Sequence, residues 1–261
     1  MFDPSEERIY DIVKNETVRK HQVKSQVFLT SSLKDHTALS VAGKIGLQIA
    51  SKRGFPIWEV SKSHPYWQSK KIAVSSMSYS RSEKGIFTLA MIGTTNSSQS
   101  TVYNYCLTDL LSREAVAREA LDHFYKNWLW QYLQREGSFP NTIIIYREGL
   151  SSAQVKRTIS SELEALENVI GEYSLKECTN YQHYRPEVIL MTVNKKVNTR
   201  YYMHAKNKEG EDIYKNPVPG SVIYCELASN DEIDFYLLPQ KTEIGTASPC
   251  QYRLIYYHPE H

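Results

Sequence analysis

The stretch TIIIYREGL, residues 142–150, decides the fold class of this chain. Its β-branched run predicts a buried strand, and Glu148 places a carboxylate where that strand ends. Ser151 and Ser152 are good helix caps, and apolar residues then recur at helical spacing to about Tyr173. The stretch therefore predicts an α/β unit in which a strand delivers an acid just before an amphipathic helix.

Further strands and helices surround this unit. Three short apolar runs precede it at 70–78, 85–95 and 100–108, and the turn segments between them predict an antiparallel meander. A helix is expected from Ser112 to Glu136, with its apolar face formed by Val116, Leu121, Phe124, Trp128 and Leu129. The late strands are expected in PEVILMTVNKK, SVIYCEL, IDFYLL and QYRLIYY. Three meander strands followed by helix, strand, helix and strand are typical of a mixed, RNase H-like sheet flanked by helices.

The N-terminal part predicts a smaller, separate subdomain. A helix is expected from Ser5 to about Lys20, a short strand at 25–30, and a second helix from about His36 to Arg53. The second helix has an expected buried stripe of Val41, Ile45 and Ile49. The segment 53–70 carries two prolines and many polar residues, which predicts a boundary between two subdomains.

Composition limits the class of protein. The chain has 261 residues, a hydrophobic fraction of 41%, and 31 Lys and Arg against 29 Asp and Glu. Its net charge therefore does not indicate a nucleic-acid-binding protein, although a local basic site can exist on a protein whose net charge is near zero. No apolar run approaches the roughly 20 residues of a membrane span, and the four cysteines form no CxxC pair. These features predict a soluble intracellular protein, cytoplasmic or nuclear.

Several segments together resemble the PIWI domain of Argonaute proteins, and the PIWI clade more than the Argonaute clade. They are KIGLQIASKRG, IIIYREGLSSAQ, ILMTVNKKVNTRYY, NPVPGSVI, DFYLLPQ and GTASPCQYRLIYY. The resemblance implies that residues 1–62 are the C-terminal part of a partial, Rossmann-like MID domain. Residues 63–261 would be the PIWI domain without its C-terminal helices. The N-terminal domain, the PAZ domain and the first half of the MID domain would precede Met1.

The resemblance also implies a pocket for the 5′-phosphate of a small guide RNA. Position by position, the stacking tyrosine and the phosphate-contacting residues of the family fall on Tyr10, Lys14, Gln26, Gln48 and Lys52. A glutamine in place of a further lysine resembles PIWI-clade pockets, in which Mg²⁺ completes the neutralisation of the phosphate. The implied partners are guide RNA, complementary target RNA and silencing-effector proteins, bound by a monomer.

The chemistry of this pocket is coherent without the resemblance. Gln48 and Lys52 stand four residues apart, so they share one face of the predicted helix. Lysines supply point charges for a terminal phosphate, and an aromatic ring stacks on any base. Each residue taken singly is better explained as part of a solvated helix face, and only the whole set favours a phosphate site.

Family nucleases hold two Mg²⁺ ions with three acids and a histidine. The first acid position falls on Ser76 or Met77, and the second falls on Val116, with Glu114 and Glu119 at neighbouring positions whose side chains point elsewhere. The third acid is Glu148, and the position of the histidine lies beyond His261. Since only one acid is retained, the sequence predicts a PIWI domain that does not cleave RNA and needs no catalytic metal.

Two alternatives remain open at this point. One is a Mg²⁺-dependent endoribonuclease with a rebuilt site around Glu148, in which Glu83 would need a rearranged hairpin to take part. The other is a truncated, non-functional fragment or a protein-binding scaffold. The resemblance also places Arg200, in NTRYY, in a loop near the guide, which makes it a candidate for contact with the RNA backbone. His183 and His204 are expected at the surface, because neither has a second ligand at metal spacing.

Overall fold

The computed structural model describes residues 4–33, 38–57, 59, 61, 63–81, 87–98, 101–110, 115–148, 152–175, 183–224, 233–242 and 245–259. The chain divides into two compact units, Met1–Ser61 and Lys62–His261. None of the described helices is long and apolar enough to cross a membrane.

The first unit contains two main helices. α1 (Pro4–Lys14) continues as a wider π-helical segment, Asn15–Lys20, and a 3₁₀ turn, Thr30–Leu33, precedes α2 (Ala38–Lys52). The two predicted helices are therefore present. The stripe expected on α2 is less buried than predicted, because Val41 and Ile45 are only half-buried and Ile49 is exposed.

The strand predicted at 25–30 is wrong. The residues between His21 and Thr30 have irregular backbone, and no strand of the described part of this unit lies beside them. The carbonyl oxygen of Ser25 accepts hydrogen bonds from lysine side chains, where a strand would accept from a neighbouring backbone. A β-branched run without a pairing partner does not make a strand.

The second unit is built on a mixed sheet with the order β3-β2-β1-β4-β5-β10-β9-β8. β1 (Ile72–Arg81), β2 (Phe87–Thr94) and β3 (Val102–Leu110) form the antiparallel meander that the sequence predicted. β4 (Thr142–Glu148) lies parallel to β1 and to β5 (Glu187–Asn194). β10 (Cys250–His258) lies antiparallel to β5, β9 (Asp234–Leu237) lies antiparallel to β10, and β8 (Val222–Tyr224) lies antiparallel to β9. The predicted RNase H-like order is confirmed.

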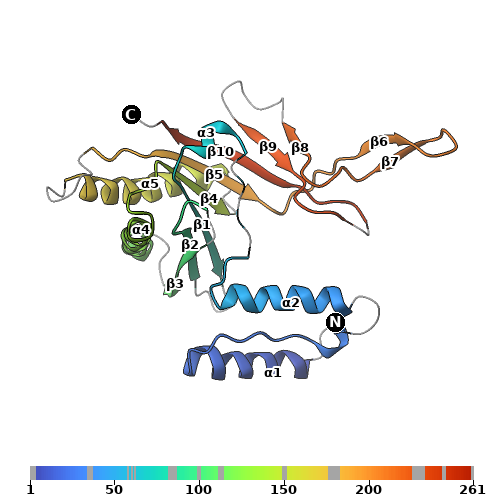
Figure 1. Ribbon diagram of the computed structural model, residues 1–261, viewed down its shortest axis with the longest axis horizontal. Helices are drawn as coiled ribbons and strands as arrows, with labels where there is room; N and C mark the ends of the chain where they lie inside the picture. The colour runs from blue at the N-terminus through green and yellow to red at the C-terminus, as the bar shows by residue number, and fades with distance from the viewer. Residues whose placement is uncertain are drawn as a thin grey trace. The chain divides into compact units, whose positions relative to one another are not determined.

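Two helices cover one face of this sheet, as Figure 1 shows. They are α4 (Ala115–Glu136) and α5 (Ser152–Leu175), close to the predicted ranges. Alternate residues of β4 point to opposite faces, so Ile143 and Ile145 enter the core while Tyr146 and Glu148 face away from the helices. The core also contains most of the apolar face predicted for α4: Leu121, Phe124, Trp128 and Leu129.

Two short elements were not predicted. β6 (Met203–Lys206) and β7 (Asp212–Lys215) form a separate hairpin that extends beyond the main sheet in Figure 1, and α3 (Pro65–Gln68) is a single turn. The side chains of the hairpin are mostly exposed, so its strands show no apolar periodicity. Its turn ends at Gly210, whose φ of 84° favours glycine.

A buried ion pair joins the end of β4 to α5. Arg147 Nε donates to Glu162 Oε1 at 2.9 Å, and each side chain is only 1% exposed. A second nitrogen of Arg147 donates to the backbone oxygen of Glu148 at 3.1 Å. The ion pair therefore holds the end of β4 against α5.

We expect Glu162→Gln to lower the free energy of unfolding by about 3–5 kcal/mol, since it leaves the charge of Arg147 buried without a counter-charge. Urea denaturation measures this loss. Glu164→Gln is the matched control, because Glu164 lies on α5 like Glu162 but pairs at the surface with Arg118 of α4. This exposed pair should contribute no more than about 1 kcal/mol. Equal losses in the two variants would contradict a special role for the buried pair.

Gly93 in β2 allows a close contact between the sheet and α4. A Cβ atom at Gly93 would overlap the indole ring of Trp128, whose Nε1 donates to the oxygen of Thr94 at 2.7 Å. The ring is fully buried and cannot move aside without disturbing the core.

We predict that Gly93→Ala lowers the free energy of unfolding by about 1–3 kcal/mol through this overlap. Thermal or chemical denaturation gives the value. Gly171→Ala, near the C-terminal end of α5 and with open space around its Cβ position, should instead be neutral or stabilise by about 0.5–1 kcal/mol. A neutral Gly93→Ala variant would show that the contact with Trp128 is not tight.

Candidate phosphate site and candidate nuclease site

Two lysines of the first unit converge on one backbone oxygen. Lys14 Nζ, from the end of α1, donates to the oxygen of Ser25 at 2.8 Å and to its Oγ at 3.0 Å. Lys52 Nζ, from the end of α2, donates to the same backbone oxygen at 2.8 Å. Two ammonium groups from different helices thus meet at the irregular segment between those helices.

Gln26 and Tyr10 complete this cluster. Gln26 Oε1 accepts from Lys52 Nζ at 2.6 Å, and its amide nitrogen donates to the oxygen of Val27 at 3.0 Å. Lys14 Nζ lies 5.7 Å from the centre of the Tyr10 ring, and this ring is 46% exposed. The ring is therefore held beside the lysines and remains open to a stacking partner.

Four of the five residues predicted for the phosphate site lie together. Gln48, the fifth, is exposed one helical turn before Lys52, and it makes no hydrogen bond to another described residue. Sequence reasoning missed Ser25, whose backbone oxygen is the centre of the cluster. No sequence signal could have identified it, because its contact is made by the main chain.

The electrostatics of this cluster favour an anion. Both ammonium groups are bound to neutral oxygen atoms, and neither lysine forms an ion pair with any described residue. Two positive charges at one point repel each other unless a negative charge lies between them. A phosphate group supplies that charge together with acceptor oxygens.

Mg²⁺ binds oxygen ligands and usually keeps phosphate oxygens among them. The cluster contains two protein oxygen atoms of the kind that bind Mg²⁺, the side-chain oxygen of Gln26 and the backbone oxygen of Ser25. Lysine ammonium groups contact both of these atoms, so the Mg²⁺ that the resemblance implies could use them only in place of those contacts.

The candidate nuclease site centres on Glu148 at the end of β4. Ser78 Oγ, from β1, donates to Glu148 Oε2 at 2.9 Å, and Lys195 Nζ lies 3.2 Å from Glu148 Oε1. The hydrogen bond from Ser78 and then the contact with Lys195 hold the pKa of Glu148 below its ordinary value. The carboxylate is therefore ionised at neutral pH, with a partner on each oxygen.

The neighbouring position on β1 differs from the two that the sequence suggested. Met77 is fully buried in the core on the helix side of the sheet, so it cannot share a site with Glu148. Ser76 lies on the same face as Glu148 but pairs with Tyr146, two residues earlier in the strand. Ser78, which the sequence analysis did not single out, is the residue that contacts Glu148.

The remaining acid positions add no carboxylate to this site in the part of the chain that the structure describes. Val116 lies in the first turn of α4, but nothing is described of its side chain, and Glu83 and Glu114 lie outside the described residues. Glu119 is exposed on α4. Among the described residues, no three His, Cys, Asp or Glu side chains come close enough together to hold a metal ion.

The other residues weighed from the sequence lie at the surface. Arg200 is exposed, and one of its guanidinium nitrogens donates to the backbone oxygens of Val197 at 2.7 Å and Thr199 at 2.8 Å. His204 Nε2 lies 3.0 Å from Asp212 Oδ1 across the β6–β7 hairpin. His183 is exposed, as expected.

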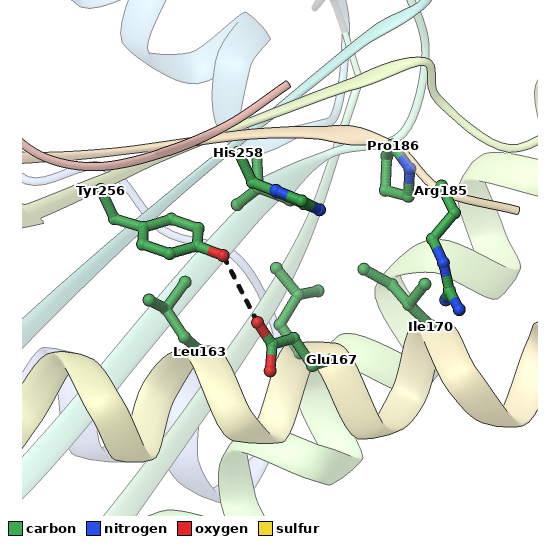
Figure 2. Close-up of a pocket in the computed structure, with 9 residues that line it drawn as sticks. Leu163, Glu167, Ile170, Arg185, Pro186, Tyr256 and His258 are labelled. Carbon is green, nitrogen blue, oxygen red and sulfur yellow. Dashed lines mark hydrogen bonds between the residues drawn. The ribbon is translucent and has the colours of Figure 1, made fainter. Parts of the chain in front are cut away.

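A cavity of about 260 Å³ lies on the helix side of the sheet, between α5, the start of β5 and the end of β10 (Figure 2). Its floor is apolar, and at its rim Tyr256 OH donates to Glu167 Oε1 at 3.4 Å. Glu148 faces the opposite side of the sheet, so this cavity is not part of the candidate nuclease site.

Comparisons with known proteins agree with this architecture. The Piwi domain family profile matches residues 1–258. Piwi-like protein 3 of Homo sapiens is 26% identical over 251 residues, which are 96% of this chain and 26% of that protein. Protein piwi of Drosophila melanogaster is 25% identical over 248 residues, covering 95% of this chain and 27% of that protein. The chain thus spans about a quarter of the length of these relatives.

Solved structures show the same fold. The crystal structure of Drosophila Piwi aligns with 96% of this chain and 31% of its own length, with a TM-score of 0.70 and 20% identity. The Kluyveromyces polysporus Argonaute with a guide RNA aligns with 73% of this chain and 23% of its own length, with a TM-score of 0.58 and 18% identity. Since the profile match extends over nearly the whole sequence, the chain belongs to the Piwi domain family.

Proposed function

We propose that this chain is the guide-binding part of a PIWI-clade protein that recognises RNA by base pairing and does not cleave it. The observation that carries the proposal is the convergence of Lys14 and Lys52 on Ser25, with the open ring of Tyr10 beside them. The domain assignment, MID for residues 1–62 and PIWI for 63–261, belongs to the same proposal. So do an intracellular location, cytoplasmic or nuclear, and silencing-effector partners for a monomeric protein.

The ligand that suits this cluster is the 5′ end of a guide strand. A terminal phosphate carries a charge of about −1.5 to −2 at neutral pH, which two lysines balance. The first base of the strand then stacks on Tyr10, which needs no particular base identity. The structure of the Kluyveromyces polysporus Argonaute, which contains a guide RNA, supports this class of ligand.

We expect the protein to bind 5′-phosphorylated small RNA more tightly than the same RNA with a 5′-hydroxyl. Lys14→Gln and Lys52→Gln should each reduce this preference by about tenfold, since each removes one charge-assisted hydrogen bond to phosphate. Fluorescence anisotropy with both RNAs measures the ratio. Lys44→Gln is the control, because Lys44 is exposed on α2 but takes no part in the cluster. Equal affinity of the unmodified protein for the two RNAs would contradict the proposed 5′-phosphate site.

The same assay with Mg²⁺ or with EDTA tests the proposed metal. Chelation should weaken the preference for the 5′-phosphate without abolishing it, because the two lysines attract the phosphate by themselves. Complete loss in EDTA would show that the metal supplies most of the neutralising charge.

The absence of cleavage is proposed from the surroundings of Glu148. Ser78 and Ser76 present hydroxyl groups on the β1 side, and a lysine lies on the other side. Two Mg²⁺ ions carry four positive charges, which one carboxylate cannot balance. The site as described therefore lacks the negative charge that a two-metal nuclease needs.

A cleavage assay separates this proposal from the endoribonuclease alternative. Guide-loaded protein should leave a fully complementary target RNA intact with either Mg²⁺ or Mn²⁺, and Glu148→Ala should behave in the same way. Guide occupancy is measured in the same samples, so that failure of loading is not mistaken for inactivity. Cleavage by the unmodified protein that Glu148→Ala abolishes would establish a rebuilt nuclease site.

A further inference from the structure

Lys195 reaches Glu148 because of the register between β4 and β5. Glu148 pairs with Val193 across the two parallel strands, and paired residues point to the same face of a sheet. Lys195 follows Val193 by two residues, so it also lies on that face, just past the end of β5. Strand alternation thus places the lysine beside the carboxylate.

Both oxygens of Glu148 are bound by groups of this chain. Oε2 accepts from Ser78 at 2.9 Å and Oε1 contacts the ammonium of Lys195 at 3.2 Å. Behind the carboxylate, the guanidinium of Arg147 holds the backbone oxygen of the same residue at 3.1 Å. The described groups around Glu148 therefore comprise one hydroxyl and two cations.

We infer that the ammonium of Lys195 is the resident cation of the Glu148 site and competes with divalent metal ions for its carboxylate. The inference rests on the proposed loss of metal-dependent cleavage, and it assigns part of that loss to a residue outside the acid positions. Lysine substitutes for a metal here because it is a cation tethered within reach of the carboxylate, at a high effective concentration.

The effect of Lys195 on metal affinity is limited by the solvent exposure of Lys195 and Glu148. The side chain of Lys195 is 62% exposed and that of Glu148 is 40% exposed, so water and salt screen their attraction. Removing the lysine should therefore tighten metal binding by about two- to fivefold. Arg147 remains in every variant and contributes the same repulsion to each.

Ser78→Asp provides a background in which metal binding can be measured, because it places a second carboxylate beside Glu148. In this background we expect Lys195→Ala to tighten Mn²⁺ binding by about two- to fivefold, as measured by electron paramagnetic resonance of free Mn²⁺. Lys195→Arg keeps the positive charge and should leave the affinity unchanged. Lys196→Ala removes an equal charge from the next residue, which does not contact Glu148, and should also have little effect. Glu148→Gln should abolish the binding and so confirm its location.

Two results would overturn the inference. One is an unchanged Mn²⁺ affinity when Lys195 is replaced by alanine. The other is an equal gain from Lys196→Ala, which would indicate a general effect of net charge. Neither result bears on the proposed function, which depends on the preference for the 5′-phosphate and on the cleavage assay.

Discussion

The buried contact between Arg147 and Glu162 is the constraint on which the second unit depends. Residues on a strand alternate between faces, so a charged side chain directed toward the helices needs a partner on those helices. Glu162 on α5 provides this partner at 2.9 Å. Because the side chain of Arg147 points into the core on the helix side of the sheet, the next residue, Glu148, must point to the opposite face. The position of the candidate nuclease site is thus a consequence of how the core accommodates one arginine.

The same alternation arranges the neighbours of Glu148. β1 and β5 both run parallel to β4, so their last residues reach the same edge of the sheet. Ser78 comes from one strand and Lys195 follows the other. In a fold of this kind, the residue types at these strand ends decide whether the edge binds metal ions. Here the strand ends supply a hydroxyl and an ammonium to a single carboxylate.

Much of this arrangement could be predicted from the sequence, because long periodic segments identify their own elements. The strand at 142–147, the helix after it and the meander before it were all predicted, and Lys14 and Lys52, which the resemblance assigned to one site, both bond to the backbone oxygen of Ser25. The position on β1 was predicted less well. Ser76, Met77 and Ser78 are consecutive, and a shift of one residue exchanges the two faces of a strand. Only the observed pairing with β4 shows that Met77 enters the core and that Ser78 meets Glu148.

Other features depend on partners that a sequence pattern does not specify. The segment 25–30 has the composition of a strand, yet the carbonyl of Ser25 accepts from lysines of two helices. Lys195 lies in the segment ILMTVNKKVNTRYY, but the sequence assigned it no role, because its contact with Glu148 depends on the register of β5 against β4. The strand at 25–30 was predicted wrongly and Lys195 was overlooked for the same reason. In each case long-range contacts decide between local alternatives that have similar energies.

Lysines define both sites, but their surroundings give the sites opposite character. Lys14 and Lys52 meet neutral oxygen atoms, so their charges remain available to an incoming anion. Lys195 meets the carboxylate of Glu148, so each group already neutralises the other. Under the proposed function, the first unit would attract a phosphate end and the second would bind divalent metals weakly. The two charge patterns are the basis of the proposal that the protein binds a nucleic acid strand without cleaving it, because binding phosphates needs uncompensated positive charge whereas two-metal cleavage needs uncompensated negative charge.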